Sequence, residues 1–217
     1  LLDEARRWYP DFTAVVVTQG AELPELPPQT RVVSVPDSLM QSLSSMRTPQ
    51  GVVFALRLPQ RPALSLRPGM VLLDRIQDPG NLGTILRTAD AFEIPVVLTN
   101  GCADPYSDKT VRASMGAAFH LNLVRLESFD EYRGLAGERE YYLFRLRNAK
   151  PLADQGRTAG APFTLVFGNE AAGLPKDLED FGNGVIIPHS DKIDSLNLAV
   201  AAGIGLYAFS AGARQGA

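Results

Sequence analysis

Three segments of the chain place polar side chains and glycine directly after a run of apolar residues. They are residues 74–83 (DRIQDPGNLG), 168–175 (GNEAAGLP) and 188–197 (PHSDKIDSLN). Side-chain amides, carboxylates and hydroxyls in such loops can orient a reacting group, and glycine lets the backbone approach a ligand closely. The polar candidates are Asn81, Glu170, Ser195 and Asn197. For any one loop alone, the same residues could simply build a tight turn, with Asn81 or Ser195 capping a helix.

Several familiar kinds of site are excluded by the sequence. No GxGxxG opens a helix after a strand, and GxxxxGK[ST] does not occur, so a standard dinucleotide or P-loop site is not expected. Residues 112–116 (RASMG) half resemble the nucleophile elbow of serine hydrolases, but arginine stands at position 112, where glycine is required. One cysteine and two distant histidines provide no zinc-ligand spacing, so we expect no metal.

The elements that position these loops alternate from residue 70 onward. Near-continuous apolar strands separated by helices are typical of a parallel sheet buried on both faces. In such a doubly wound α/β domain, ligands bind beyond the carboxyl ends of the strands, where the three loops lie. We expect strands at 71–73, 96–98, 164–167 and 185–187, and helices at 82–92, 107–118, 128–136, 175–181 and 195–209.

A smaller α/β unit is expected over residues 1–58, ahead of this domain at 70–217. Its expected elements are a helix at 1–8, strands at 14–18, 31–35 and 51–56, and a helix at 37–46. The intervening segment, 59–69, contains three prolines and no hydrophobic periodicity, which indicates a linker. Because the chain starts without methionine, we expect further residues before Leu1 in the natural protein.

Composition limits the partners that the chain can have. The net charge of −3 argues against a generally basic nucleic-acid binder, yet 17 of the 21 basic residues are arginine, which suits phosphate contacts. Any RNA surface must therefore be local, and we expect it on Arg6, Arg7, Arg47, Arg57 and Arg61. The longest near-apolar run, 198–209, is shorter than the roughly 18 residues of a bilayer span, so no membrane segment is expected. A single cysteine favours a reducing, cytoplasmic setting.

Taken together, the loops resemble a known family. Residues 73–89 are similar to the first motif of the SpoU (TrmH-like) branch of the SPOUT RNA methyltransferases, 165–174 to the second, and 187–188 with 195–202 to the third. Residues 101–106 and 111–117 resemble the region between motifs, so the similarity covers 70–209. More weakly, residues 1–56 resemble the family's L30e-like substrate-binding domain, which implies ribosomal RNA more than transfer RNA.

The resemblance implies a Rossmann-like parallel sheet with a C-terminal trefoil knot, a homodimer, and methylation of a ribose 2′-hydroxyl by S-adenosylmethionine. Carried over by position, the backbone of Gly168, Ile187 and Leu196 receives the cofactor. The family's conserved polar set, taken as catalytic, corresponds to Asn81, Arg87, Glu170, Ser195 and Asn197. Two alternatives stay open: a transfer RNA 2′-O-methyltransferase, and an inactive RNA-binding protein of the same fold.

Arg87 is the family's candidate for the proton-transfer step. Because a guanidinium in a protein stays protonated, we expect Arg87 to fix an RNA phosphate and stabilise the developing alkoxide, with the proton passing to a phosphate or water. One alternative is that Arg87 is a true base. Another is that it is an exposed helix charge with no part in the reaction. Glu170 could anchor Asn81 and Arg87 or cap the following turn, and Ser195 could also cap the last helix.

Two places depart from the family's pattern. His189 and Asp191 stand in the third motif where methionine and glycine are common, and Phe144-Arg145 occupies a strand end that is usually small and acidic. We expect Asp191 to be a solvated loop residue rather than to face the cofactor. The rim of the cofactor pocket is expected to differ from the family's usual form.

Overall fold

The protein is described by a computed structural model, which covers the chain except residues 59–62, 157, 159, 179–180 and 215–217. It contains two compact units, Leu1–Gln60 and Arg61–Ala217. The division falls inside the segment 59–69 that the sequence predicts as a linker, although residues 59–62 of that segment, with Arg61, lie outside the described residues.

The first unit contains a sheet of three strands, with the order β2-β1-β3. Its strands are β1 (Phe12–Thr18), β2 (Arg31–Val35) and β3 (Val52–Leu56), and its helices are α1 (Leu2–Trp8) and α2 (Asp37–Leu43). β1 pairs parallel with β2 and antiparallel with β3. The helix predicted to reach residue 46 ends at Leu43, because Ser44 is extended and its Oγ accepts a hydrogen bond from the Met46 N–H at 3.1 Å.

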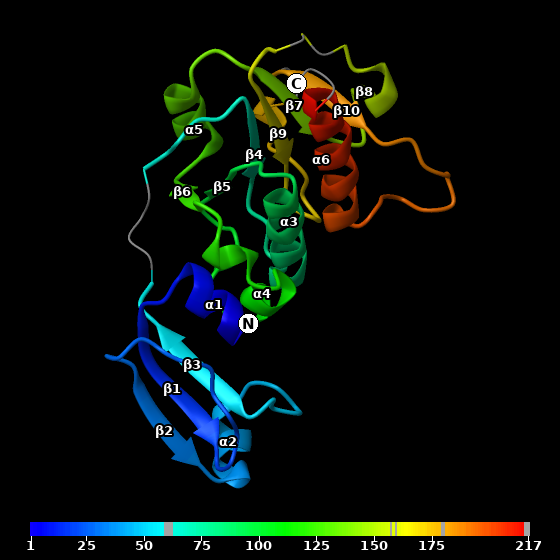
Figure 1. The fold of residues 1–217 in the computed structure, drawn as a ribbon. Helices are drawn as coiled ribbons and strands as arrows, with labels where there is room; N and C mark the ends of the chain where they lie inside the picture. Colours follow the sequence, from blue (N-terminus) through cyan, green and yellow to red (C-terminus); the bar gives the residue numbers. More distant parts are fainter. Residues whose placement is uncertain (59–62, 157, 159, 179–180, 215–217) are drawn as a thin grey trace. The chain divides into compact units, whose positions relative to one another are not determined.

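The second unit is built on seven parallel strands in the order β6-β5-β4-β9-β7-β10-β8 (Figure 1). The prediction of an α/β fold with a parallel sheet is confirmed, whereas the trefoil knot stays a prediction. The strands are β4 (Gly69–Leu73), β5 (Val96–Thr99), β6 (Val124–Leu126), β7 (Glu140–Phe144), β8 (Lys150–Pro151), β9 (Phe163–Phe167) and β10 (Asn183–Ile186).

Helices cover both faces of this sheet, as the apolar strands predict (Figure 1). Successive residues of a strand point to opposite faces, so Val71 and Leu73 of β4 pack with α3 (Pro79–Ala91) and α6 (Leu198–Arg214). Met70 and Leu72 pack on the other face with α5 (Phe129–Ala136). α3 lies against both α6 and the short α4 (Asp108–Ala113), so its start is held at the carboxyl-end edge of the sheet.

Four helix predictions for the second unit were wrong in extent. The helix expected at 82–92 begins at Pro79, because Asp78 caps it there. The helix expected at 107–118 ends at Ala113, because Met115 (φ 52°) and Gly116 (φ 96°) adopt left-handed backbone that breaks a helix. The helix expected at 175–181 is a 3-10 turn at Lys176–Leu178, and residues 179–180 lie outside the described residues. The last helix begins at Leu198, not at residue 195. Within the described part of the chain, no helix is both long enough and apolar enough to cross a bilayer.

Candidate active site

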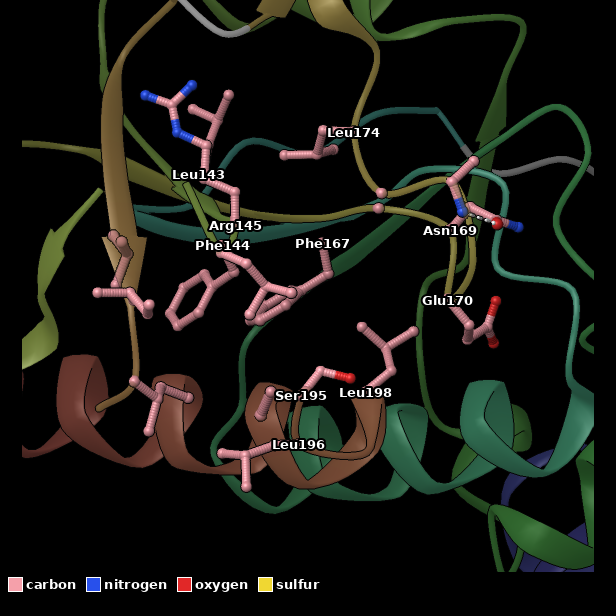
Figure 2. Close-up of a pocket in the computed structure, with 18 of the residues that line it drawn as sticks. Leu143, Phe144, Arg145, Phe167, Asn169, Glu170, Leu174, Ser195, Leu196 and Leu198 are labelled. Atoms are coloured by element: carbon pink, nitrogen blue, oxygen red, sulfur yellow. Dashed lines mark hydrogen bonds between the residues drawn. The ribbon is translucent and has the colours of Figure 1, made fainter. Parts of the chain in front are cut away.

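A cavity of about 760 Å³ lies where the carboxyl ends of β7, β9 and β10 meet (Figure 2). This volume is within the usual range for small-molecule sites, and the aromatic rings of Phe144 and Phe167 stack on its wall at 4.3 Å between centroids. The loops predicted to carry chemistry supply much of its lining. Gly168, Ile187 and Leu196, the residues that the sequence assigns to the cofactor, all line the cavity.

Asn81 joins the three loops through its side-chain amide. Its Nδ2 donates to Glu170 Oε1 at 3.2 Å, and its Oδ1 accepts from Asn197 Nδ2 at 3.0 Å. Glu170 also accepts hydrogen bonds from the backbone N–H groups of Gln77 and Asp78, each at 3.3 Å. The three polar side chains therefore form one hydrogen-bonded junction beside the cavity, which we call the Asn81 junction.

The start of α3 places Asn81 at this junction. Asp78 is the N-cap: its Oδ1 accepts from the Asn81 N–H at 2.8 Å, and Pro79 occupies the first helical position. That hydrogen bond, aided by the charge of Lys109 at 3.5 Å, lowers the pKa of the Asp78 carboxyl. Capping by Asn81 itself, one of the interpretations left open by the sequence, is wrong, because Asp78 caps the helix.

Asn197 has two functions at the third loop. Its Oδ1 accepts from the backbone N–H groups of Ala199 (2.9 Å) and Val200 (3.3 Å), so it caps α6 while its Nδ2 holds Asn81. Capping of the last helix by Ser195 is therefore wrong. Ser195 instead lies in the loop before α6, on the cavity wall (Figure 2).

Arg87 does not line the cavity. It is exposed on α3, about 9 Å along the helix axis from Asn81 at 1.5 Å per residue. Glu170 anchors Asn81, as expected, but in the part of the chain that the structure describes it makes no hydrogen bond or ion pair with Arg87. Of the five polar residues predicted to be catalytic, the structure brings Asn81, Glu170, Ser195 and Asn197 together at the cavity and leaves Arg87 outside it.

The departures from the family's pattern fall on the cavity rim. His189 lines the cavity, and its Nδ1 donates to the Ile187 carbonyl at 2.8 Å. Asp191 is exposed and is not part of the lining, in agreement with a solvated loop residue. Phe144 and Arg145 extend from the end of β7 to opposite sides of that strand and both line the cavity (Figure 2). The rim therefore carries an aromatic ring and a cation.

Gly168 is required by its own loop. A Cβ at this position would lie 2.6 Å from the Gly173 carbonyl carbon and 2.6 Å from the Leu174 nitrogen. Space that the sequence suggested for a ligand is thus occupied by the returning backbone of residues 173–174. A large side chain at 168 would disrupt the loop, so Gly168→Trp tests loop packing as much as ligand binding.

Sequence reasoning missed two residues of this loop's support, Arg75 and Asn169. The Asn169 Nδ2 donates to the Arg75 carbonyl at 2.9 Å, and its Oδ1 accepts from the N–H groups of Ala171 and Ala172. The available signal was the Asn in Gly168-Asn169-Glu170, since Asn side chains often bond their own turn. Among the described residues, no three His, Cys, Asp or Glu side chains cluster as metal ligands do.

Comparisons with known proteins agree with this geometry. The model of the SpoU rRNA Methylase family matches residues 68–207. The 23S rRNA (guanosine(2553)-2′-O)-methyltransferase RlmP of Bacillus subtilis is 34% identical over 175 residues, which are 79% of this chain and 69% of that protein. An uncharacterized tRNA/rRNA methyltransferase of Synechocystis is 36% identical over 181 residues, 80% of this chain and 65% of that protein.

The chain thus spans about two thirds of the length of these two relatives. A crystal structure of an AdoMet-bound rRNA methyltransferase from Sinorhizobium meliloti superposes with a TM-score of 0.80 at 29% identity, covering 99% of this chain and 84% of that one. The parallel sheet, the cavity formed by three motif loops and these matches lead to one conclusion: the chain belongs to the SpoU rRNA methylase family.

Proposed function

We propose that this chain transfers a methyl group from S-adenosylmethionine to a ribose 2′-hydroxyl in ribosomal RNA. The observation that carries the proposal is the Asn81 junction, which holds the three motif loops at the edge of a single cavity. The relative from Bacillus subtilis, whose name states 2′-O-methylation of 23S rRNA, favours ribosomal RNA as the substrate.

The cavity fits the cofactor chemically. Phe144, Phe167 and Leu198 give an apolar wall suited to the purine ring, and Gly168, Ile187 and Leu196 bring main-chain groups to the same space. S-adenosylmethionine supplies a methyl group on a sulfonium that is already an activated leaving group, so the protein must mainly align the reactants and help remove a proton.

We assign the removal of the 2′-hydroxyl proton to the protein surface next to the Asn81 junction, where the RNA would bind. Arg87 is exposed on α3, so its guanidinium can meet an RNA phosphate and stabilise negative charge that develops on the ribose oxygen. Asn81, Glu170 and Asn197 act by holding the start of α3 against the cavity. Ser195 stands on the cavity wall, where its hydroxyl can contact either reactant.

The test is methyl transfer to RNA from cells that lack the gene. The purified protein is incubated with tritiated S-adenosylmethionine and either the ribosomal or the transfer RNA fraction, and 2′-O-methylnucleosides are mapped by mass spectrometry. Label in a single ribosomal RNA nucleotide is expected. Label in transfer RNA alone would establish the alternative substrate, and no label despite cofactor binding would favour an RNA-binding protein without activity.

A homodimer is also proposed, with α6 as its contact surface. Val200, Ile204 and Tyr207 recur at helical spacing on this helix and are 51%, 38% and 65% exposed, so an apolar stripe is open to a second copy. Sedimentation should give a dimer at micromolar concentration, and Tyr207→Asp should give a monomer. A wild-type monomer would contradict the proposal.

We propose that the protein works in the cytoplasm, where ribosomal RNA is found and where the free Cys102 is expected to stay reduced.

The first unit is proposed to contribute to the RNA-binding surface. Arg7, Arg47 and Arg57 are exposed on this unit, and Arg6 is partly exposed. Because phosphate contacts release counterions, RNA affinity should fall steeply with salt.

A further inference from the structure

The loop 168–174, which forms one wall of the cavity, is held on two sides. Glu170 binds it to the start of α3 through the Asn81 junction. Arg75, the second residue after β4, holds the other side: its guanidinium Nη2 donates to the Gly173 carbonyl at 3.4 Å, and its own carbonyl accepts from Asn169 Nδ2 at 2.9 Å. Both ends of the loop's turn are therefore bound to one residue outside it.

A buried carboxylate fixes the direction of the Arg75 side chain. Asp74 is only 5% exposed; its Oδ2 accepts from Arg75 Nε at 2.9 Å and its Oδ1 from Thr99 Oγ1 at 2.7 Å. The same Thr99 oxygen accepts from the Arg75 N–H at 3.2 Å. A paired charge and a buried hydroxyl thus aim the guanidinium from the ends of β4 and β5 at the loop.

The backbone conformation of Arg75 would favour glycine, so an arginine at this position suggests that its side chain has a function. Arg75 has φ 55°, a left-handed conformation that glycine adopts with less strain. A second residue of the same kind, Glu93 (φ 56°), is exposed after the end of α3. Glu93 therefore provides a matched control in which glycine relieves the same backbone strain far from the loop.

We propose that Arg75 is a positioning residue of the cofactor cavity, which holds the loop 168–174 in its binding conformation through the Asp74–Arg75–Gly173 chain of contacts. The inference rests on the proposed function, because the ligand is the cofactor of that reaction. Arg75 is not part of the cavity lining and acts through Asn169 and Gly173. Its removal should let the wall move and raise the free-energy cost of ordering the loop around the ligand.

The test compares Arg75→Gly with Glu93→Gly. Both variants relieve a left-handed backbone, but Arg75→Gly also leaves the buried Asp74 carboxylate without its ion pair, so its melting temperature should fall further than that of Glu93→Gly. Binding is therefore measured at a temperature at which both variants are folded. Affinity for S-adenosylhomocysteine, measured by calorimetry, should fall about tenfold in Arg75→Gly, as expected for a lost charged hydrogen bond, and stay unchanged in Glu93→Gly. In turnover, KM for S-adenosylmethionine should rise with kcat at saturation nearly constant.

Asp74→Asn gives a second route to the same contact, because it removes the charge that aims the guanidinium and keeps an acceptor for Thr99. Its loss of affinity and that of Arg75→Gly should not add in the double variant, since both break one chain of contacts. Additive losses, or equal affinity in Arg75→Gly and Glu93→Gly, would overturn the inference. If the wild-type protein binds neither S-adenosylmethionine nor S-adenosylhomocysteine, the proposed function itself is overturned. This result is obtained before any variant is compared, so the two failures can be told apart.

Discussion

The two halves of α3 differ in how their polar groups are used. At its start, the side chains of Asp78 and Asn81 are both hydrogen-bonded within the protein, and Glu170 and Asn197 complete the Asn81 junction. Less than two turns further along, Arg87 is exposed, and no described residue accepts a hydrogen bond from it. Groups that are already paired position the loops, whereas an unpaired cation is free to meet a substrate phosphate.

The largest expected effect separates these two roles. Arg87→Ala should lower the methyl-transfer rate by at least about 100-fold, because it removes a group that stabilises developing charge. Calorimetric affinity for S-adenosylmethionine and the melting temperature should stay nearly constant. Arg133→Ala, an exposed arginine on α5 across the sheet, is the matched control and should keep full activity. Full activity in Arg87→Ala would return this residue to a simple surface charge.

Arg87→Lys sharpens the same comparison. A lysine keeps the charge but loses the planar fork, and it loses its proton far more easily than arginine. An electrostatic role predicts little recovery and an unchanged shape of the pH–rate profile. Substantial recovery with a profile moved to lower pH would identify position 87 as the base.

Glu170→Gln breaks the junction itself and should have an intermediate effect. The amide retains one acceptor oxygen but turns an NH2 group toward N–H donors that the carboxylate now satisfies. We expect a loss of about 1 kcal/mol in the free energy of unfolding, and a loosened cavity wall with weaker cofactor binding. Thermal unfolding and calorimetry measure the two effects. Glu138→Gln, at an exposed position outside the junction, should change neither.

Asn197→Ala and Ser195→Ala distinguish the cap of α6 from its neighbour. The first removes a helix cap and the bond to Asn81, so it should cost about 1 kcal/mol and lower the melting temperature by about 2–4 °C. Ser195→Ala should leave the melting temperature within error, because Ser195 does not cap the helix. Equal losses in the two variants would contradict the assignment of the cap.

The smallest expected effect is the pH dependence of Asp78. The hydrogen bond from the Asn81 N–H and the charge of Lys109 lower the pKa of this carboxyl in the folded state. Its contribution to stability is therefore complete above the unfolded pKa of about 3.9 and is lost as pH falls through the lower folded value. Asp78→Asn, which keeps a cap, should be less sensitive than the wild type to acid below about pH 4 in urea unfolding. Identical acid sensitivity would show that the cap charge contributes nothing.

Much of the second unit's architecture followed from local pattern. Apolar runs predicted β4, β5, β9 and β10, because parallel strands buried on both faces need side chains that are apolar throughout. The edge strand β6 (Val124–Leu126) was not among the predicted strands, and the short edge strand β8 was missed as well, since Lys150–Pro151 has neither length nor periodicity. β8 pairs with β10 because the folded chain returns to the edge of the sheet there, and this contact is not encoded in a local pattern.

By itself, the sequence determined that Asn81, Glu170 and Asn197 follow the carboxyl ends of apolar strands, because the alternation of strand, loop and helix is a local pattern, and in a doubly wound sheet such segments share one edge. Only the tertiary structure decided how these residues are used. The hydrogen bond between Asn81 and Glu170 and the contact of Arg75 with Gly173 join residues that are distant in sequence. The choice of Asp78 as the cap of α3 was settled only by the position at which the packed helix begins. Such contacts form when the helices and strands pack, and no local pattern records them.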